Sequence, residues 1–410
     1  MGAAVEPPVF AHTPISQIAP TVTKLRATFF SGKTRPYEYR IRQLQKLYYA
    51  FTDASEELYE SLRKDLNKSR QESMITEIGW TSNDILFTIR NLAEWMKDYT
   101  PAGIPFALAA TKPRVRKEAL GCCLVIGAFN FPVQLAMGPF IACIASGNTA
   151  VLKPSEQSPH TAAVLAKIIE SSLDPSAYAC IQGAIDETTA LLDQKWDKVA
   201  YTGGIPVGKI IAKKMAETLT PVLLELGGIN PAIVTSSANV DMAAKRLLWG
   251  KTLNGGQVCL CQNYIVVPED QMTTFVDATK KYLKQFFPDG TKGSSDYSRI
   301  VNERAFDRIM GILKQTKGKV IIGGASDRSQ LWIEPTLILL DDTDDILMRE
   351  EVFGPLQAII PVKSDEEALE IARKFSDNSL TLFAFGEKKE TDKVLDSCRS
   401  GMCSINDGKL

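Results

Sequence analysis

Between Gly121 and Gly228 the chain alternates short apolar runs of strand length with longer runs of helix length. Strands joined in this way by helices lie parallel in one sheet, and the helices cover both of its faces. The stretch therefore predicts an α/β domain built on a parallel sheet. Its expected strands are 122–126, 149–152, 179–182, 198–201 and 222–226, and its expected helices are 133–145, 159–171, 188–194 and 207–219.

The sequence on either side of this stretch predicts an extended lead-in, a helical segment and a second α/β domain. Residues 1–20 carry four prolines and are expected to be extended, whereas 21–99 show helical spacing of apolar residues. A second α/β stretch follows Gly228, with strands expected at 232–235, 264–267, 356–361 and 381–385 and helices at 241–253, 275–287 and 366–375. A chain of 410 residues exceeds the roughly 250–300 residues at which one core stops growing, so at least two domains are expected.

Charge and composition argue against several classes of partner. The net charge of −1 gives no reason to expect nucleic acid or an acidic membrane. Residues 119–152 contain no charged side chain, but Asn130, Pro132 and Pro139 interrupt them, so a buried strand, loop and helix is expected instead of a membrane span. No signal peptide is expected, and the eight cysteines are interpreted as reduced thiols of a cytoplasmic protein.

Metal and histidine chemistry are also not expected. The eight cysteines show no Cys-x-x-Cys spacing, and the two histidines show no His-x-x-His spacing, so no metal site is predicted. His12 and His160 both fit a solvated surface role. This scarcity argues against a histidine general base, which most hydrolases use.

Two short motifs carry the candidate chemistry. Cys259 follows Gly-Gly-Gln-Val, and Glu225 lies in an apolar strand just before Gly-Gly. A thiolate can attack a carbonyl, and a carboxylate can then activate water to release the acyl product. A purely structural thiol would need no glycines beside it, and a glutamate in an apolar strand is costly to bury unless it has a function. Cys261 is interpreted as a bystander.

Seven motifs in order resemble the signatures of the aldehyde dehydrogenase superfamily, and the short N-terminus and the Thr-Arg-Pro segment most resemble its class 3 and fatty-aldehyde branch. They lie at 29–37, 126–132, 152–156, 201–209, 220–228, 256–259 and 350–355. The resemblance implies a variant Rossmann NAD domain, a second α/β catalytic domain and a small bridging hairpin. The implied domains are a lead-in at 1–20, an NAD-binding domain at 21–97 and 116–226, the bridging and oligomerisation hairpin at 98–115, and the catalytic domain at 227–410.

The resemblance also implies the reaction, which is the NAD(P)-dependent oxidation of an aldehyde to its carboxylic acid through a cysteine thiohemiacetal and a thioester. Cys259 would add to the carbonyl, the side-chain amide of Asn130 would stabilise the oxyanion, and Glu225 would activate water. From the residues alone, a loop cap is the better interpretation of Asn130. The branch implies a medium- or long-chain aliphatic or an aromatic aldehyde as substrate.

The implied cofactor site lacks Gly-x-Gly-x-x-Gly, as the family does. Lys153 and Glu156 would hold the adenosine ribose, and because a carboxylate there repels a 2′-phosphate, NAD is expected over NADP, with NADP possible. Other implied contacts are Gly203, Gly204 and Gly208 at a helix start, for the pyrophosphate, and Glu351 and Phe353, for the nicotinamide side.

The sequence departs from the family pattern at three places, and two alternative functions are therefore kept open. Gly204 stands where the family often has serine, and Ile229 where it usually has lysine. The chain stops at Leu410, where family members continue through a Pro-Phe-Gly-Gly loop and a strand that completes the dimer sheet, so the homodimer of the family is expected to lack that strand and activity to be low. The alternatives are a truncated, weakly active or non-catalytic NAD-binding paralogue, or a CoA-acylating relative, which would not be expected to keep Glu225.

Overall fold

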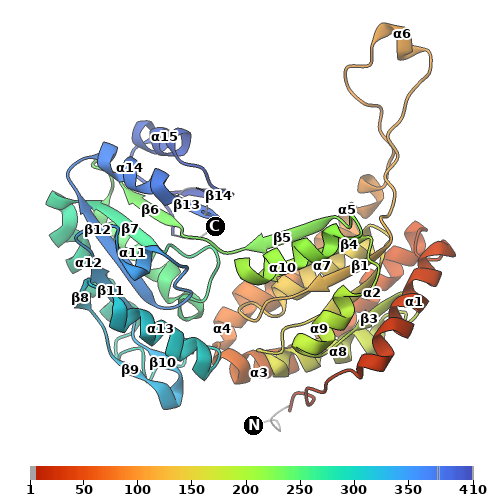
Figure 1. The fold of residues 1–410 in the computed structure, drawn as a ribbon, viewed down its shortest axis with the longest axis horizontal. Helices are drawn as coiled ribbons and strands as arrows, with labels where there is room; N and C mark the ends of the chain where they lie inside the picture. Colours follow the sequence, from red (N-terminus) through yellow and green to blue (C-terminus); the bar gives the residue numbers. More distant parts are fainter. Residues whose placement is uncertain (1–5, 376, 378, 409–410) are drawn as a thin grey trace. The chain divides into compact units, whose positions relative to one another are not determined.

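A computed structural model describes residues 6–375, 377 and 379–408 (Figure 1). Residues 1–5 of the expected lead-in and residues 409–410 of the expected catalytic domain lie outside this described part. The chain forms two compact units, which we call unit 1 (residues 1–65 and 73–225) and unit 2 (residues 66–72 and 226–410). Each unit has its own sheet and its own core.

Unit 1 opens with helices, as the spacing of apolar residues predicted. They are α1 (Ile15–Phe30), α2 (Tyr37–Asp53), α3 (Ser55–Leu66), the π-helix η1 (Met74–Ile78) and α5 (Gly79–Trp95), whereas α4 (Arg70–Ser73) lies mostly in the segment 66–72 of unit 2. The expectation that residues 15–20 are extended is wrong, because α1 begins at Ile15 and includes Pro20. Pro14 is the residue directly before the first turn, so it marks the start of the helix and does not belong to an extended segment.

The sheet of unit 1 has five strands in the order β3-β2-β1-β4-β5. β1 pairs in parallel with β2 and β4, and β2 pairs in parallel with β3, so the predicted parallel sheet is confirmed for these strands. The elements are β1 (Cys122–Ile126), α7 (Gln134–Ala145), β2 (Thr149–Lys153), α8 (Pro159–Ser172), β3 (Tyr178–Cys180), α9 (Ile185–Leu192), β4 (Lys198–Gly203), α10 (Ile205–Ala216) and β5 (Val222–Leu226).

The segment expected to form a hairpin projects from unit 1 (Figure 1). Its ends pair through an antiparallel bridge between Tyr99 and Val115, and α6 (Phe106–Ala109) lies near its tip. Phe106 is 97% exposed. Among the described residues, no helix has the length and apolar character needed to cross a membrane.

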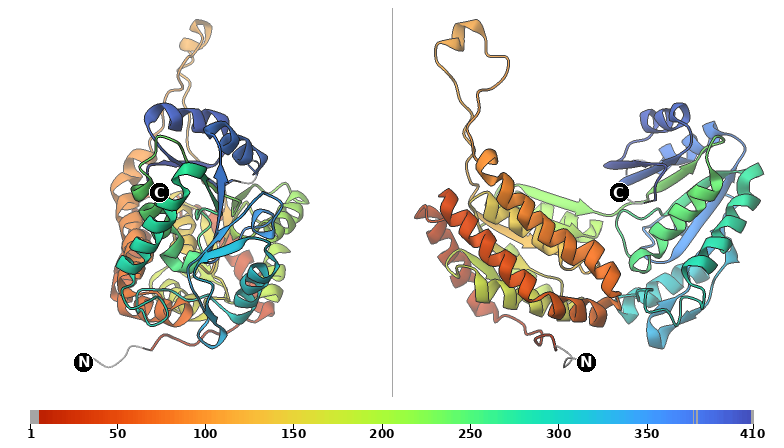
Figure 2. Two further views of the ribbon diagram at one scale, coloured as in Figure 1. Left: turned by 90° about the vertical axis from the view of Figure 1, so that its left-hand side faces the viewer. Right: turned by 180° about the vertical axis from the view of Figure 1, so that it is seen from behind.

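Unit 2 contains a seven-stranded sheet in the order β14-β13-β6-β7-β12-β11-β8, parallel except for β8. Figure 2 shows the ribbon from two further sides. Alternate residues of β6 enter different cores: Ala232 and Val234 pack with α11 and α12, whereas Ile233 packs with α13 and α14. The sheet is therefore covered on both faces. Its strands are β6 (Pro231–Val234), β7 (Tyr264–Pro268), β8 (Lys319–Ile322), β11 (Thr336–Leu339), β12 (Leu356–Val362), β13 (Thr381–Phe385) and β14 (Met402–Ile405).

The helices of unit 2 and one small ribbon complete it. They are α11 (Val240–Thr252), α12 (Met272–Phe286), α13 (Glu303–Gln315), α14 (Asp365–Phe375), α15 (Lys388–Ser397), and the antiparallel pair β9 (Ser326–Asp327) and β10 (Trp332–Ile333). Short 3-10 turns lie at η2 (Leu253–Gly256), η3 (Glu269–Gln271), η4 (Arg328–Gln330) and η5 (Ile346–Met348).

The buried side chain of Asn230, just before β6, forms hydrogen bonds with two other segments of unit 2. The amide nitrogen of Asn230 donates to the carbonyl oxygens of Cys259 and Cys261, at 2.8 and 2.9 Å. Its amide oxygen accepts from the backbone N–H groups of Leu380 and Thr381, at 2.9 and 3.0 Å. The residue before β6 thereby holds both the loop before β7 and the start of β13.

We expect Asn230→Ala to lower the free energy of unfolding of unit 2 by about 3 kcal/mol, because four buried backbone groups lose their partner. Asn239→Ala is the matched control, since that exposed side chain caps α11 with a single bond, at 3.0 Å to the N–H of Met242. The control should cost about 1 kcal/mol. Calorimetry measures the free energy of unfolding of both variants, and equal losses would contradict the proposed role of Asn230 in joining the segments of unit 2.

Candidate functional site

The loop that carries Cys259 begins with three left-handed residues. Asn254, Gly255 and Gly256 have φ of 51°, 60° and 76°, a region that asparagine tolerates and glycine favours. A Cβ on Gly256 would lie 2.3 Å from the carbonyl oxygen of Gly354. The Asn-Gly-Gly run is therefore needed to turn the chain sharply after α11.

Gln257 then holds this turn in place. Its amide nitrogen donates to the carbonyl oxygens of Asn254 and Arg299, both at 2.9 Å, and its amide oxygen accepts from the N–H of Val301 at 3.0 Å. Cys259 follows in a half-buried position, with its carbonyl oxygen bound by Asn230. Gln257 and Asn230 thus hold the backbone before and after the side chain of the candidate nucleophile.

Cys261 has a different environment. Its thiol lies 3.8 Å from the carbonyl oxygen of Gly250 in α11 and 3.5 Å from the Gln262 side-chain oxygen. Burial raises the pKa of the Cys261 thiol, which disfavours the nucleophilic thiolate. This environment supports the interpretation of Cys261 as a bystander.

Glu225 lies in unit 1, on strand β5, and its expected burial is wrong. β5 is the edge strand of the sheet, and its residues alternate between half-buried and exposed, with Glu225 among the exposed ones. Leu223, which projects from the same face of β5, is exposed as well, so this face of the strand is in contact with solvent. Glu225 lines a pocket of unit 1 that is also lined by Trp80, Thr81, Asp84, Gln134, Leu135, Gly138, Pro139 and Thr202.

Asn130 lies in the loop that joins β1 to α7 in unit 1, and it is 2% exposed. The loop starts where the Gly127 N–H donates to the carbonyl oxygen of Lys153, at 3.0 Å. The hydroxyl of Ser158 donates to the carbonyl oxygen of Phe129, at 2.8 Å. Asn130 is therefore held at the carboxyl end of a central strand.

The candidate adenosine-side residues lie at the same edge of this sheet. Lys153 ends β2 and is 3% exposed, and its ammonium lies 2.6 Å from the carboxylate of the half-buried Glu156. Ligands of open parallel sheets bind outside the carboxyl ends of the strands. β1, β2 and β4 bring their candidate residues to that edge, so these predicted residues do come together within unit 1.

Gly203 is the last residue of β4, and Gly204 follows it directly before α10. Gly204 is the residue before the helix and offers no side-chain cap, so the first N–H groups of α10 are available to an anion. A Cβ on Gly203 would lie 2.2 Å from the hydroxyl of Tyr201. Gly208 is buried in the first turns of α10, and its N–H donates to the Gly204 carbonyl oxygen. This cradle fits a dinucleotide pyrophosphate.

Glu351 and Phe353 belong to unit 2. The Glu351 side-chain oxygen Oε1 is buried and has no hydrogen-bond partner among the described residues, and a Cβ on Gly227 would lie 2.1 Å from Oε2. Phe353 has a φ of 49°, a strained value for an aromatic residue. An orphaned buried acceptor fits a ligand hydroxyl, as the predicted ribose contact requires.

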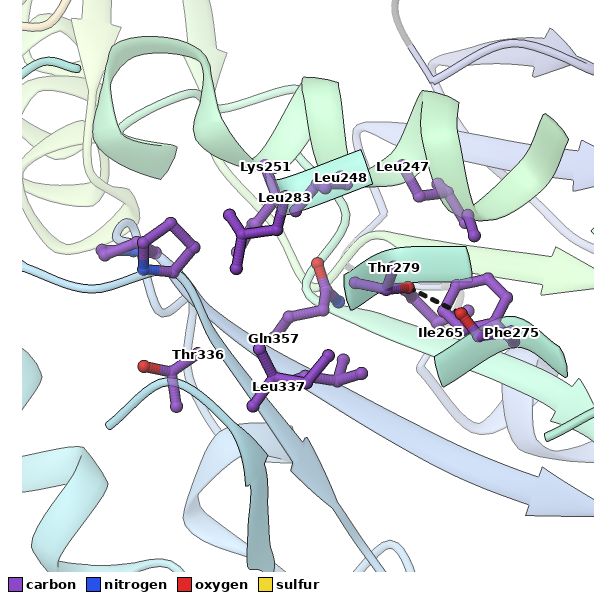
Figure 3. A pocket seen from close by; sticks show the side chains of 14 residues that line it. Leu247, Leu248, Lys251, Ile265, Phe275, Thr279, Leu283, Thr336, Leu337 and Gln357 are labelled. Carbon is purple, nitrogen blue, oxygen red and sulfur yellow. Dashed lines mark hydrogen bonds between the residues drawn. The ribbon is translucent and has the colours of Figure 1, made fainter. Parts of the chain in front are cut away.

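Three buried polar residues that are not among the predicted site residues also form hydrogen bonds with the backbone: Asn230, Lys251 and Glu77. Lys251 is 4% exposed, and its ammonium donates to the carbonyl oxygen of Gln262 at 3.2 Å. Its stem lines an apolar pocket of unit 2 together with Gln357 (Figure 3). None of the predicted catalytic residues lines that pocket. No local pattern marks these three residues, because their partners are distant in the sequence.

The buried Ile229 explains one departure from the family pattern. It is 8% exposed and packs in the core of unit 2 that also contains Ile233 and Leu382, where an apolar side chain is suited. The described residues contain no group of histidine, cysteine and acidic side chains that could hold a metal ion.

Comparisons with known proteins agree with this architecture. The sequence profile of the aldehyde dehydrogenase family matches residues 13–410. A beta-apo-4′-carotenal oxygenase of Neurospora crassa is 47% identical over 403 residues, which cover 98% of this chain and 76% of the relative. A dimeric NADP-preferring aldehyde dehydrogenase of Canis lupus familiaris is 37% identical over 394 residues, which cover 96% of this chain and 86% of the relative.

Solved structures give the same result. The substrate-bound AldH of Staphylococcus aureus superimposes with a TM-score of 0.92 at 35% identity, covering 96% of this chain and 85% of that one. The predicted fold class and the predicted resemblance, including its class 3 side, are confirmed by these matches and by an Arabidopsis thaliana family 3 member H1 at 37% identity. The chain belongs to the aldehyde dehydrogenase family.

Proposed function

We propose that Cys259 is the nucleophile with which this NAD(P)-dependent enzyme oxidises an aldehyde to a carboxylic acid. The observation that carries the proposal is the tightly fixed loop around a half-buried thiol, held by Asn230 and Gln257. The thiolate adds to the aldehyde carbon and forms a thiohemiacetal. Loss of hydride from that carbon leaves a thioester on the same sulfur.

Asn130 and Glu225 take the two supporting roles. The side-chain amide of Asn130 donates a hydrogen bond to the oxyanion, with the backbone N–H of Cys259 as second donor. Glu225 removes a proton from water, which then hydrolyses the thioester. Its exposed position on β5 supports this role, because the carboxylate is accessible to the water that it must activate.

The cofactor supplies the hydride acceptor when it is bound. Lys153 and Glu156 hold the adenosine ribose, and Gly203, Gly204 and Gly208 accommodate the pyrophosphate. The ion pair of Lys153 with Glu156 supports a preference for NAD, because the carboxylate repels a 2′-phosphate. The dog relative is named NADP-preferring, so NADP remains the expected second cofactor.

Glu351 accepts a hydrogen bond from the ribose on the nicotinamide side, and Phe353 packs on the ring. Burial raises the pKa of Glu351 to about 7, while Arg308, the Gly228 N–H and Lys251 act in the opposite direction. The ionised form of this carboxyl, which is the stronger acceptor, therefore predominates only above neutral pH.

The substrate is proposed to be an aldehyde with an apolar body, aliphatic or aromatic. Two fungal relatives, 47% and 46% identical, are named for a carotenal. The pocket beside Glu225 includes Trp80, Leu135 and Pro139 among its lining residues, which suits an apolar group.

Unit 1 is proposed as the NAD-binding domain, with residues 98–115 as the bridging segment, and unit 2 as the catalytic domain. A homodimer is proposed on two grounds: the dog relative is named dimeric, and Phe106 on the projecting segment is exposed. A cytoplasmic location is proposed because the eight cysteines are free thiols, which a reducing compartment maintains. Light scattering of the purified chain tests the dimer.

Replacing the proposed nucleophile should remove the activity. Cys259→Ala is expected to retain less than about a tenth of wild-type NADH formation with an aldehyde panel, because the covalent step is lost. Cys261→Ser is the control, and it should keep most of the activity because that thiol packs against α11. Turnover that survives Cys259→Ala would refute the assignment.

Glu225→Gln should stall the enzyme after the first oxidation. We expect a burst of about one NADH per site followed by slow turnover, because the thioester forms but is hydrolysed slowly. Stopped-flow absorbance resolves the two phases. A wild-type steady-state rate without a burst would show that another group activates the water.

Affinity for NAD should depend on the ionisation of Glu351. If the carboxylate is the acceptor, the dissociation constant for NAD falls by up to about tenfold between about pH 6 and about pH 8, because ionisation rises through the pKa of about 7. Glu351→Gln should bind NAD with little change over the same interval. Titration of protein fluorescence measures both, and a pH-independent wild type would contradict the role of Glu351.

A further inference from the structure

The start of α7 is capped by a side chain from another helix. Val133 occupies the capping position and has no polar group to offer. The carboxylate oxygen Oε2 of Glu77 instead accepts from the N–H groups of Val133 and Gln134, both at 3.0 Å. Glu77 is fully buried, at 0% exposed. A buried carboxylate at a helix N-terminus is stabilised by these N–H groups and by the helix dipole.

The wide turn that carries Glu77 is a π-helix, a rare element that is frequent at functional sites. A Cβ on Gly79 would lie 2.6 Å from the carbonyl oxygen of Met74, so the turn requires a glycine at its end. With its amide oriented to satisfy both partners, Gln134 donates to the carbonyl oxygen of Thr76 and accepts from the Trp80 indole N–H, each at 3.2 Å. This region therefore contacts the first residue of α7 through both backbone and side chain.

These contacts lie next to the proposed oxyanion donor. Asn130 sits three residues before Val133, in the loop whose other side is held by Ser158 through the Phe129 carbonyl oxygen. Glu77 fixes the end of that loop, and Ser158 fixes its beginning. Trp80 and Gln134 also line the pocket beside Glu225.

We propose that Glu77 is a positioning residue that holds the Asn130 loop in the geometry needed for oxyanion stabilisation. The proposal rests on the proposed role of Asn130. Donors to an oxyanion act through preorganised placement, and such sites must be held to within about 0.5 Å by supporting residues. Loss of the carboxylate would let the start of α7 and the attached loop relax, while the cofactor residues stay in place.

A double-mutant cycle tests this directly. We expect Glu77→Gln to lower kcat/KM for aldehyde by about 10- to 100-fold with an unchanged dissociation constant for NAD. Because Glu77 acts through Asn130, the Glu77→Gln, Asn130→Ala double variant should be no worse than Asn130→Ala alone. Glu187→Gln is the matched control, since that buried carboxylate caps α9 through the Ala184 N–H, at 2.7 Å, and touches no part of the loop. The control should lower Tm without lowering kcat/KM.

Each other outcome has a definite meaning. A double variant whose loss equals the product of the single losses would overturn the proposal, because Glu77 would then act independently of Asn130. An unchanged Glu77→Gln beside an impaired Asn130→Ala would overturn it while leaving the proposed function intact. An unchanged Asn130→Ala would overturn both. Should Glu77→Gln fail to fold, Glu77→Asp, which keeps the charge, is carried through the same cycle.

Discussion

The structure of unit 2 depends on the side-chain amide of Asn230, whose hydrogen-bonding positions are all paired. An asparagine offers two donor and two acceptor positions on one short side chain, and here all four are paired with backbone groups of two distant segments. Aspartate would lack the donors, and leucine would lack all four. The candidate nucleophile at Cys259 is thus placed by a residue that follows the Gly-Gly of another motif.

The three left-handed residues Asn254–Gly256 act together with these hydrogen bonds of Asn230. It reverses the chain after α11 and delivers the next residues to the Asn230 amide, while Gln257 closes the turn from the other side. A loop held at both ends keeps a thiol in a defined place without burying it. The neighbouring residue Cys261 is also half-buried, but burial raises the pKa of its thiol and its sulfur packs against a helix.

The sequence was most informative where local pattern decides the outcome. Strands β1, β5 and β13 have the predicted bounds, because apolar runs between turn residues have few alternatives. Prediction failed where partners are distant. Neither the exposed face of β5, which carries Glu225, nor the contact of Glu77 with the start of α7 can be seen within one sequence window. The small ribbon of β9 and β10 is too short to leave an alternating pattern.

The most direct test of the account is to locate the acyl group. Glu225→Gln protein would be mixed with NAD and an aldehyde, quenched in acid, digested and analysed by mass spectrometry. The account predicts the mass of the acyl group on Cys259 and none on Cys261, because the Cys261 sulfur packs against α11 and its raised pKa disfavours the thiolate. An acyl group on Cys261, or continued NADH formation with no acylated cysteine, would contradict it.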